Sequence, residues 1–198
     1  MEISRYGPRS FYFVASALSV ITDPPDDVGS LSVDVVISST EPDESSEASR
    51  ELANRRLIQG PGEYEIADVF IHGIRTYRDT EKGATHGRNT AYSLTMDSVR
   101  LCYLGHIGHP PTSDNASSIG DVDVLLVPFG QAALDTAAVA ETVGILEPRL
   151  ILPIGEPTQA DLEALAKELG VPLQPPSDKL SLTHSTLPPE PQVTILTT

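Results

Sequence analysis

Beyond residue 120, the hydrophobic pattern of the chain changes from that of short strands to an alternation of strands and helices. Continuous apolar runs at Val122–Pro128 and Arg149–Ile154 are typical of buried strands. Asp135 and Thr158 can each cap a helix after one of these runs, and Gly170 is a stop signal for the second helix. Many strands followed by strand–helix–strand–helix predict a layered α/β or α+β protein in which helices cover a sheet.

The first part of the chain is predicted to consist of short strands joined by tight connections, opening as a β-meander. A short polar helix is expected on the surface from about residue 46 to 54, and residues 78–89 form a long loop of the kind that is often functional. The expected strands outside the two apolar runs are Glu2–Tyr6, Phe11–Ala15, Leu18–Asp23, Val33–Ser39, Glu63–Ile66, Val69–Tyr77, Thr90–Met96, Val99–Leu104, Leu180–Thr183 and Val193–Leu196.

Composition limits the classes of partner. The 198 residues suit one domain over 1–198, and 39% hydrophobic residues are enough for a core. A formal charge of -15 argues against nucleic acid and anionic membranes as partners, and the start of the chain lacks the order of a signal peptide, so we expect a cytoplasmic protein. The single cysteine, Cys102, lies in an apolar run and is expected in the core.

The run Val33–Ser39 ends abruptly in the acidic segment that begins with Thr40 and continues through Glu41, Asp43 and Glu44. Clustered carboxylates are not buried unpaired, so the chain must emerge there at a surface or a cleft. A loop after a buried strand is a common address for an active site in layered α/β proteins. The alternative is a solvated acidic turn, and the residue types alone do not distinguish the two.

Several framework segments together resemble the metallo-β-lactamase superfamily, in its small single-domain bacterial metal-dependent hydrolase branch. They are Tyr6-Gly7 with Phe11, Thr22-Asp23-Pro24, Gly60–Ile66, Gly73–Thr76, Asn89-Thr90, Leu104-Gly105 with Gly108-His109, Val122–Pro128 and Leu146–Arg149. The resemblance covers nearly the whole chain and implies a four-layer αββα sandwich with the functional site at one edge, between the two sheets.

The same resemblance implies that the family's zinc ligands have been replaced. Members of the superfamily carry His-x-His-x-Asp-His, which holds two Zn²⁺ ions that acidify a bridging water. The further ligand positions correspond to Pro8, to His106 in place of an aspartate, to Gly155 and, in the mid-chain loop, to Arg78. The residues that match the motif itself are Ser39, Glu41, Asp43 and Glu44. Only the aspartate is retained, and a cationic guanidinium cannot replace an imidazole ligand.

Two interpretations of this cleft, which also includes His109 and Glu156, remain open. In the first, no metal or other cofactor binds, and the protein has a binding or regulatory role toward a small molecule or a protein that the sequence does not identify. In the second, Glu41, Asp43, Glu44 and His106 hold Mn²⁺, Mg²⁺ or a single Zn²⁺ in a remodelled hydrolase site. A third alternative is a structural subunit of a homo-oligomer. A serine hydrolase is not expected, because the sequence shows no adjacent His–Asp partner for Ser39 and no Gly-x-Ser-x-Gly elbow.

Overall fold

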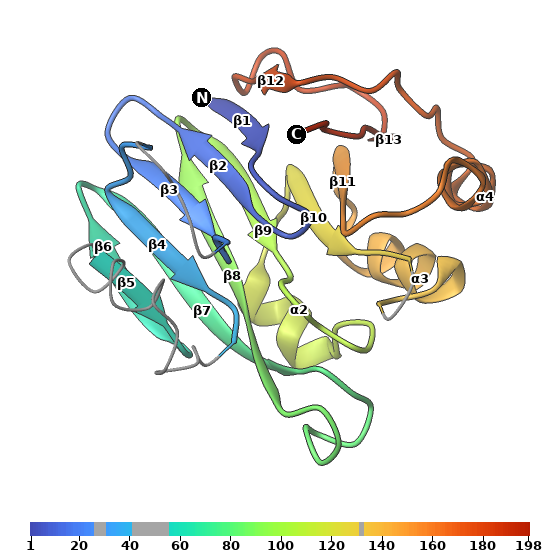
Figure 1. Ribbon diagram of the computed structural model, residues 1–198, viewed down its shortest axis with the longest axis horizontal. Helices are drawn as coiled ribbons and strands as arrows, with labels where there is room; N and C mark the ends of the chain where they lie inside the picture. Colours follow the sequence, from blue (N-terminus) through green and yellow to red (C-terminus); the bar gives the residue numbers. More distant parts are fainter. Residues whose placement is uncertain (26–30, 41–55, 131–132) are drawn as a thin grey trace.

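The computed structural model describes residues 1–25, 31–40, 56–130 and 133–198, and it places two mixed β-sheets face to face (Figure 1). The six-stranded sheet has the order β12-β1-β2-β3-β4-β5, and the seven-stranded sheet has the order β13-β11-β10-β9-β8-β7-β6. The strands of the first sheet are β1 (Glu2–Arg5), β2 (Phe11–Val14), β3 (Ser19–Thr22), β4 (Val35–Ser38), β5 (Arg56–Gln59) and β12 (Lys179–Ser181). Those of the second are β6 (Gly62–Ile66), β7 (Val69–Tyr77), β8 (Arg88–Met96), β9 (Val99–Tyr103), β10 (Val124–Pro128), β11 (Leu150–Ile154) and β13 (Gln192–Val193).

The expected opening meander is correct for three strands and wrong for the fourth. Strands β1, β2 and β3 are antiparallel neighbours, but β4 runs parallel to β3 and β5 parallel to β4. The parallel pairing requires a crossover in place of a hairpin between β3 and β4. Its consequence is that Asp23 and Ser39, which follow β3 and β4, leave the sheet at the same edge.

The predicted change after residue 120, from short strands to an alternation of strands and helices, is confirmed. Helices α3 (Thr136–Leu146) and α4 (Gln159–Leu169) are capped by Asp135 and Thr158, whose side chains accept hydrogen bonds from backbone N–H groups in the first turn. Strands β9, β10, β11 and β13 are parallel, as alternating strands and helices require. The sequence did not predict α2 (Ser113–Ile119), which lies in a polar stretch, or β5. The expected helix at about 46–54 lies outside the described residues.

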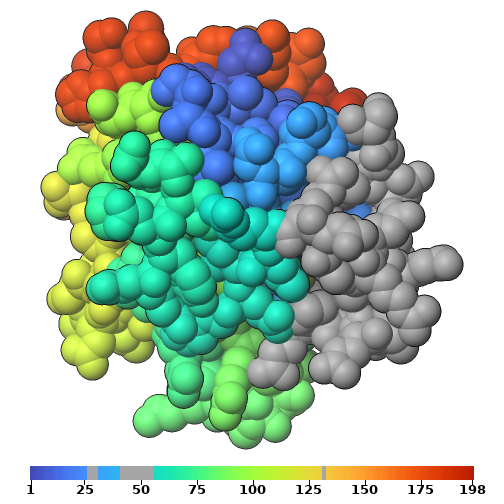
Figure 2. Space-filling model, turned by 90° about the vertical axis from the view of Figure 1, so that its left-hand side faces the viewer, coloured from blue at the N-terminus to red at the C-terminus, as the bar shows by residue number. Residues whose placement is uncertain are grey.

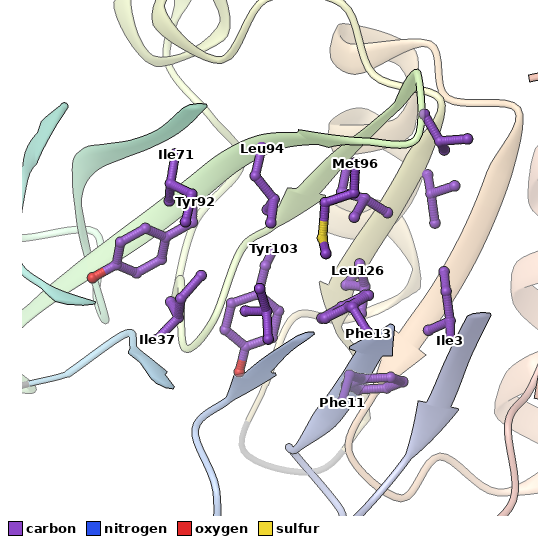
Figure 3. Packing of buried hydrophobic residues seen from close by; sticks show 14 of the residues in the cluster. Ile3, Phe11, Phe13, Ile37, Ile71, Tyr92, Leu94, Met96, Tyr103 and Leu126 are labelled. Atoms are coloured by element: carbon purple, nitrogen blue, oxygen red, sulfur yellow. The ribbon is translucent and has the colours of Figure 1, made fainter. Parts of the chain in front are cut away.

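Two apolar clusters hold the layers together. One fills the space between the sheets, where Ile37, Tyr92 and Tyr103 from three different strands point toward one another (Figure 3). The other joins the outer face of the seven-stranded sheet to the described helices and includes Leu125, Val139 and Leu165. Cys102 belongs to this second cluster, as predicted, and burial raises the pKa of its thiol to about 12.

The C-terminal segment supplies the edge strand of the six-stranded sheet, next to the first strand of the chain. Strand β12 pairs with β1, and the N-terminal ammonium donates to the carbonyl of Leu182 at 2.8 Å. In Figure 2 this segment lies beside the N-terminal strands at the top of the face, with β6 below them. Within the described ranges, no helix combines the length and the apolar content that crossing a bilayer requires.

Candidate functional site

The candidate site lies at the edge where parallel strands of both sheets end. Asp23 follows β3, Ser39 follows β4, and His106 follows β9 by three residues. Because parallel strands end at the same edge, the topology brings these three side chains together from segments far apart in the sequence. This edge is the one at which the resemblance places the family's metal centre.

Asp23, Ser39 and His106 form a hydrogen-bonded cluster. The Ser39 backbone N–H donates to Asp23 Oδ1 at 2.7 Å, and the Ser39 hydroxyl donates to Asp23 Oδ2. His106 Nδ1 lies 2.9 Å from Ser39 Oγ and 3.5 Å from Asp23 Oδ2. The Ser39 hydroxyl uses its hydrogen in the bond to the carboxylate, so it can only accept from His106. The hydrogen-bond pattern therefore assigns a proton to Nδ1 of His106, and Nε2 remains available to a ligand.

Asp23 is a buried carboxylate that its neighbours keep ionised. Burial by itself raises its pKa, but hydrogen bonds from His106, Ser39 and Tyr103 together lower the pKa of Asp23 below its ordinary value. The Tyr103 hydroxyl donates to Asp23 Oδ2 at 2.7 Å. Burial, followed by the charge of Asp23, raises the pKa of Tyr103 well above the usual range. At neutral pH, the cluster therefore contains a carboxylate and a neutral phenol.

The backbone at Gly105 allows the His106 loop to approach Ser39. Gly105 has φ = +60°, and a Cβ at this position would lie 2.3 Å from Ser39 Cβ. Asn89 fixes the same loop, since its Oδ1 accepts the His106 backbone N–H at 2.8 Å and its amide donates to the Leu104 carbonyl at 2.9 Å. The position of His106 is thus determined by the backbone as well as by Ser39.

No His–Asp partner is adjacent to Ser39 in the sequence, but the fold brings Asp23 and His106 to it from distant segments. The arrangement is nevertheless not a catalytic triad. In a triad the serine and the aspartate bind opposite ring nitrogens of the histidine, whereas here both face Nδ1 of His106. Ser39 is also only 1% exposed, so a substrate carbonyl cannot reach its hydroxyl. Sequence reasoning missed the spatial cluster because parallel pairing of β3 and β4 was not expected.

A hollow of about 380 Å³ opens beside His106. Its charged and titratable described lining residues are Arg9, Arg78, His86 and His106. Arg78 and His86 come from the loop between β7 and β8, which projects at the bottom of Figure 1. The loop packs closely on the His106 segment: Gly108 N–H donates to the Tyr77 carbonyl at 2.9 Å, and a Cβ at Gly108 would lie 2.2 Å from the Arg78 carbonyl oxygen.

The other cleft residues named from the sequence are distributed around this hollow. Gly155 and Glu156 line a neighbouring hollow of about 740 Å³, together with Pro8 and Arg9. His109 packs near Tyr77, with ring centroids 6.5 Å apart, and it is not among the described residues that line either hollow. Glu41, Asp43 and Glu44 lie outside the described residues.

The backbone joins two positions that the resemblance assigns to metal ligands. The Gly155 N–H donates to the Pro8 carbonyl at 2.8 Å. Arg5 lies alongside and donates to the carbonyl oxygens of both residues, at 2.5 Å to Gly155 and 3.3 Å to Pro8. Burial lowers the pKa of Arg5, and nearby Glu156 partly offsets this effect.

The described residues do not fit the family's two-metal centre. Both oxygens of Asp23 accept hydrogen bonds from Ser39, and Pro8 and Gly155 carry no donor side chain. Across the described ranges, no group of three or more His, Cys, Asp or Glu side chains is placed to hold a metal ion. Arg78 adds a positive charge where a cation would have to bind.

Several residues of the site were not singled out by the sequence analysis: Asp23, Arg9, Asn89, His86 and Tyr103. Asp23 and Asn89 belong to segments that carry the family resemblance, which was the available signal for them. Arg9 and His86 have no spacing that indicates a site. They line it because the β1–β2 connection and the β7–β8 loop meet at this edge.

The chain belongs to the β-lactamase superfamily, because the family model for the beta-lactamase superfamily domain matches residues 2–155. The same fold occurs in solved structures that cover nearly the whole chain. A proposed Zn-dependent hydrolase of the metallo-β-lactamase superfamily from Thermotoga maritima is 22% identical with a TM-score of 0.78, covering 98% of this chain and 97% of its own.

Two further structures are similar to this chain over most of their length. A proposed metal-dependent hydrolase from Parabacteroides distasonis is 15% identical, with a TM-score of 0.67 and coverage of 98% and 91%. The metallo-β-lactamase fold protein YhfI from Bacillus subtilis is 10% identical, with a TM-score of 0.63 and coverage of 98% and 95%. At these identities, the similarity establishes the fold. No curated protein sequence matches the chain.

Proposed function

We propose that this chain is a ligand-binding protein that keeps the metallo-β-lactamase fold without the family's two-metal hydrolase chemistry. The observation that carries the proposal is the hydrogen-bonded cluster of Asp23, Ser39 and His106. A metal ligand needs a free lone pair, and Asp23, Ser39 and Nδ1 of His106 hydrogen-bond to one another. The partner is a small molecule that occupies the hollow beside His106.

The chemistry of the cluster supports binding over catalysis of hydrolysis. Attack by water needs a metal-bound hydroxide or a general base within reach of a water molecule. Both oxygens of Asp23 accept hydrogen bonds, three in all from Ser39 and Tyr103, and only 10% of its side chain is exposed. His106 Nε2 has no partner among the described residues, and His106 lines the hollow, so Nε2 can contact a ligand there.

The test sets this proposal against the remodelled carboxylate site. Esterase, phosphodiesterase and lactonase substrates are assayed with added Mn²⁺ or Zn²⁺, using the wild type and the variant Glu41→Gln/Asp43→Asn/Glu44→Gln. We expect no metal-dependent turnover from either protein, and elemental analysis of the purified wild type should find no stoichiometric zinc. If the wild type turns over a substrate and the variant loses at least two orders of magnitude of that rate, the carboxylates act in catalysis and the proposal is wrong.

A further inference from the structure

The described lining of the hollow beside His106 has a charge opposite to that of the whole protein. The chain contains 28 acidic residues against 13 lysines and arginines, so an average surface region should be acidic. The described lining of this hollow instead contains two arginines, two histidines and no carboxylate. Its other described residues, Ile107, Gly108, Pro128 and Ala133, are uncharged. A local reversal of sign at a cleft concentrates anions there.

The two guanidinium groups of the hollow have no structural partner in the part of the chain that the structure describes. Within the described ranges, the side chains of Arg9 and Arg78 form no hydrogen bond and no ion pair. Arg5 and Arg100 behave differently, since Arg5 donates to backbone carbonyls and Arg100 pairs with Asp123. Arginine offers a planar set of donors that matches carboxylate and phosphate oxygens. Arg9 and Arg78 therefore have donors available for a ligand.

The loop that carries Arg78 and His86 is organised before any ligand binds. The Asp79 carboxylate accepts four backbone N–H groups of this loop, from Glu81, Gly83, Thr85 and His86, at distances of 2.7–3.1 Å. These hydrogen bonds lower the pKa of Asp79 to about 2, and the one from the His86 N–H has the largest effect. A charged loop that is already folded pays less ordering entropy when it binds.

We infer that this hollow binds a small oxyanion, namely the phosphate or carboxylate group of a metabolite, held by the guanidinium groups of Arg9 and Arg78 with His106 and His86 beside them. The inference rests on the proposed function and names the class of its ligand. The volume of about 380 Å³ is sufficient for a small metabolite and too small for a macromolecular segment.

The test measures binding of inorganic phosphate and of acetate by isothermal titration calorimetry. The protein solution contains a chelator. Sodium chloride keeps the ionic strength constant, so general screening of charges does not change during the titration. The variants are Arg78→Gln and Arg9→Gln. Lys167→Gln is the matched control, because it removes one positive charge from an exposed position of α4 outside the hollow.

We expect saturable binding of one anion per chain, weakened about tenfold or more by Arg78→Gln and by Arg9→Gln, as the loss of a charge-assisted hydrogen bond predicts. Lys167→Gln should change the affinity less than about twofold. Tighter binding of phosphate indicates a phosphorylated ligand, and tighter binding of acetate indicates a carboxylate. Both outcomes support the inference.

Two outcomes would overturn it. One is the absence of saturable binding of either anion by the wild type, and the other is an equal loss of affinity in Arg78→Gln and Lys167→Gln. The result is independent of the hydrolase assay. Metal-dependent turnover would disprove the proposed function whether or not phosphate binds, while failure of anion binding without turnover would disprove only the ligand class.

Discussion

The two ends of the β-sandwich differ in the partners of their charged side chains: Arg100 is paired at one end, and Arg9 and Arg78 border a hollow at the other. At the start of β9 and β10, Arg100 donates to both oxygens of the buried Asp123, at 2.9 and 2.7 Å, and reaches Asp121 at 2.6 Å. At the finish of the same strands, Arg9 and Arg78 border an open hollow without such partners among the described residues. Arg100 joins strands at one end, whereas Arg9 and Arg78 at the other end face the hollow.

The difference indicates which end carries function. An arginine paired with a buried carboxylate stabilises the fold and cannot also bind a ligand without breaking that pair. An uncommitted arginine beside a cleft contributes little to stability, so its position is explained better by binding. Substitutions at the two ends should consequently affect different measurements: stability at one end and ligand affinity at the other.

The largest effect is expected at the end that is paired. Asp123→Asn removes the charge opposite Arg100, and we expect the free energy of unfolding to fall by about 2–3 kcal/mol, less than for a fully buried pair because 40% of the Arg100 side chain is exposed. Urea denaturation measures this change. Asp121→Asn is the control, because Asp121 is 84% exposed, and it should cost less than about 1 kcal/mol. Equal losses in the two variants would contradict the comparison.

A smaller loss of unfolding free energy is expected from a substitution in the cluster of Asp23, Ser39 and His106 at the opposite end. Asp23→Asn keeps one acceptor oxygen and removes the other, so at least one donor of Ser39 or Tyr103 loses its partner, at a cost of about 1–2 kcal/mol in the free energy of unfolding. Asp34→Asn is the matched control, since Asp34 also accepts both the N–H and the hydroxyl of a serine, Ser19, but at the exposed surface. Asp34→Asn should lower the free energy of unfolding by less than Asp23→Asn does, and urea denaturation measures both changes. A larger loss in Asp34→Asn would show that burial of Asp23 adds nothing.

The same cluster predicts a dependence of stability on pH. The folded-state pKa of Asp23 is lowered, so its contribution is fully present above the unfolded-state pKa of about 3.9 and is lost as pH falls through the lower folded value. The difference in unfolding free energy between wild type and Asp23→Asn should be constant from about pH 5 to pH 8 and shrink below about pH 4. Denaturation at several pH values measures it, and a difference that persists undiminished in acid would rule out this cause.

The smallest effect is expected from removing metal. The apolar strands β4, β9, β10 and β11 supply the core between and beside the sheets, so a chelator should leave the melting temperature nearly unchanged. A bound ion that stabilised the protein would contribute several kcal/mol when present far above its dissociation constant. A fall in the melting temperature of many degrees on addition of chelator would therefore restore the remodelled metal site as an alternative.

The sequence predicted most of the frame because its signals are local. Apolar runs and the caps at Asp135 and Thr158 act within a few residues, and each is found as expected. Helix α2 was missed because its sequence is polar, and β5 because it has only two apolar residues, Leu57 and Ile58, so packing against neighbours decides their structure. The parallel pairing of β3 with β4 is a long-range feature that no local pattern encodes.

The candidate site was only partly predictable for the same reason. The family resemblance indicated Ser39, His106 and Arg78, and the structure places all three at one edge. Asp23 and Arg9 could not be assigned from spacing, because their roles depend on which strand ends meet there. The carboxylates Glu41, Asp43 and Glu44 remain a prediction, since they lie outside the described residues.

The Pro8–Gly155 junction restricts which side chains position 155 can carry. Gly155 has φ = +108°, a conformation that side-chain-bearing residues rarely adopt, and a Cβ there would lie 3.0 Å from the Phe129 carbonyl oxygen. A histidine at this position would have to rebuild the backbone as well as the side chain, against hydrogen bonds that Pro8 and Arg5 already make with Gly155. A metal-binding side chain at position 155 therefore requires concerted changes in Pro8, Arg5 and the backbone, and a single substitution does not supply it.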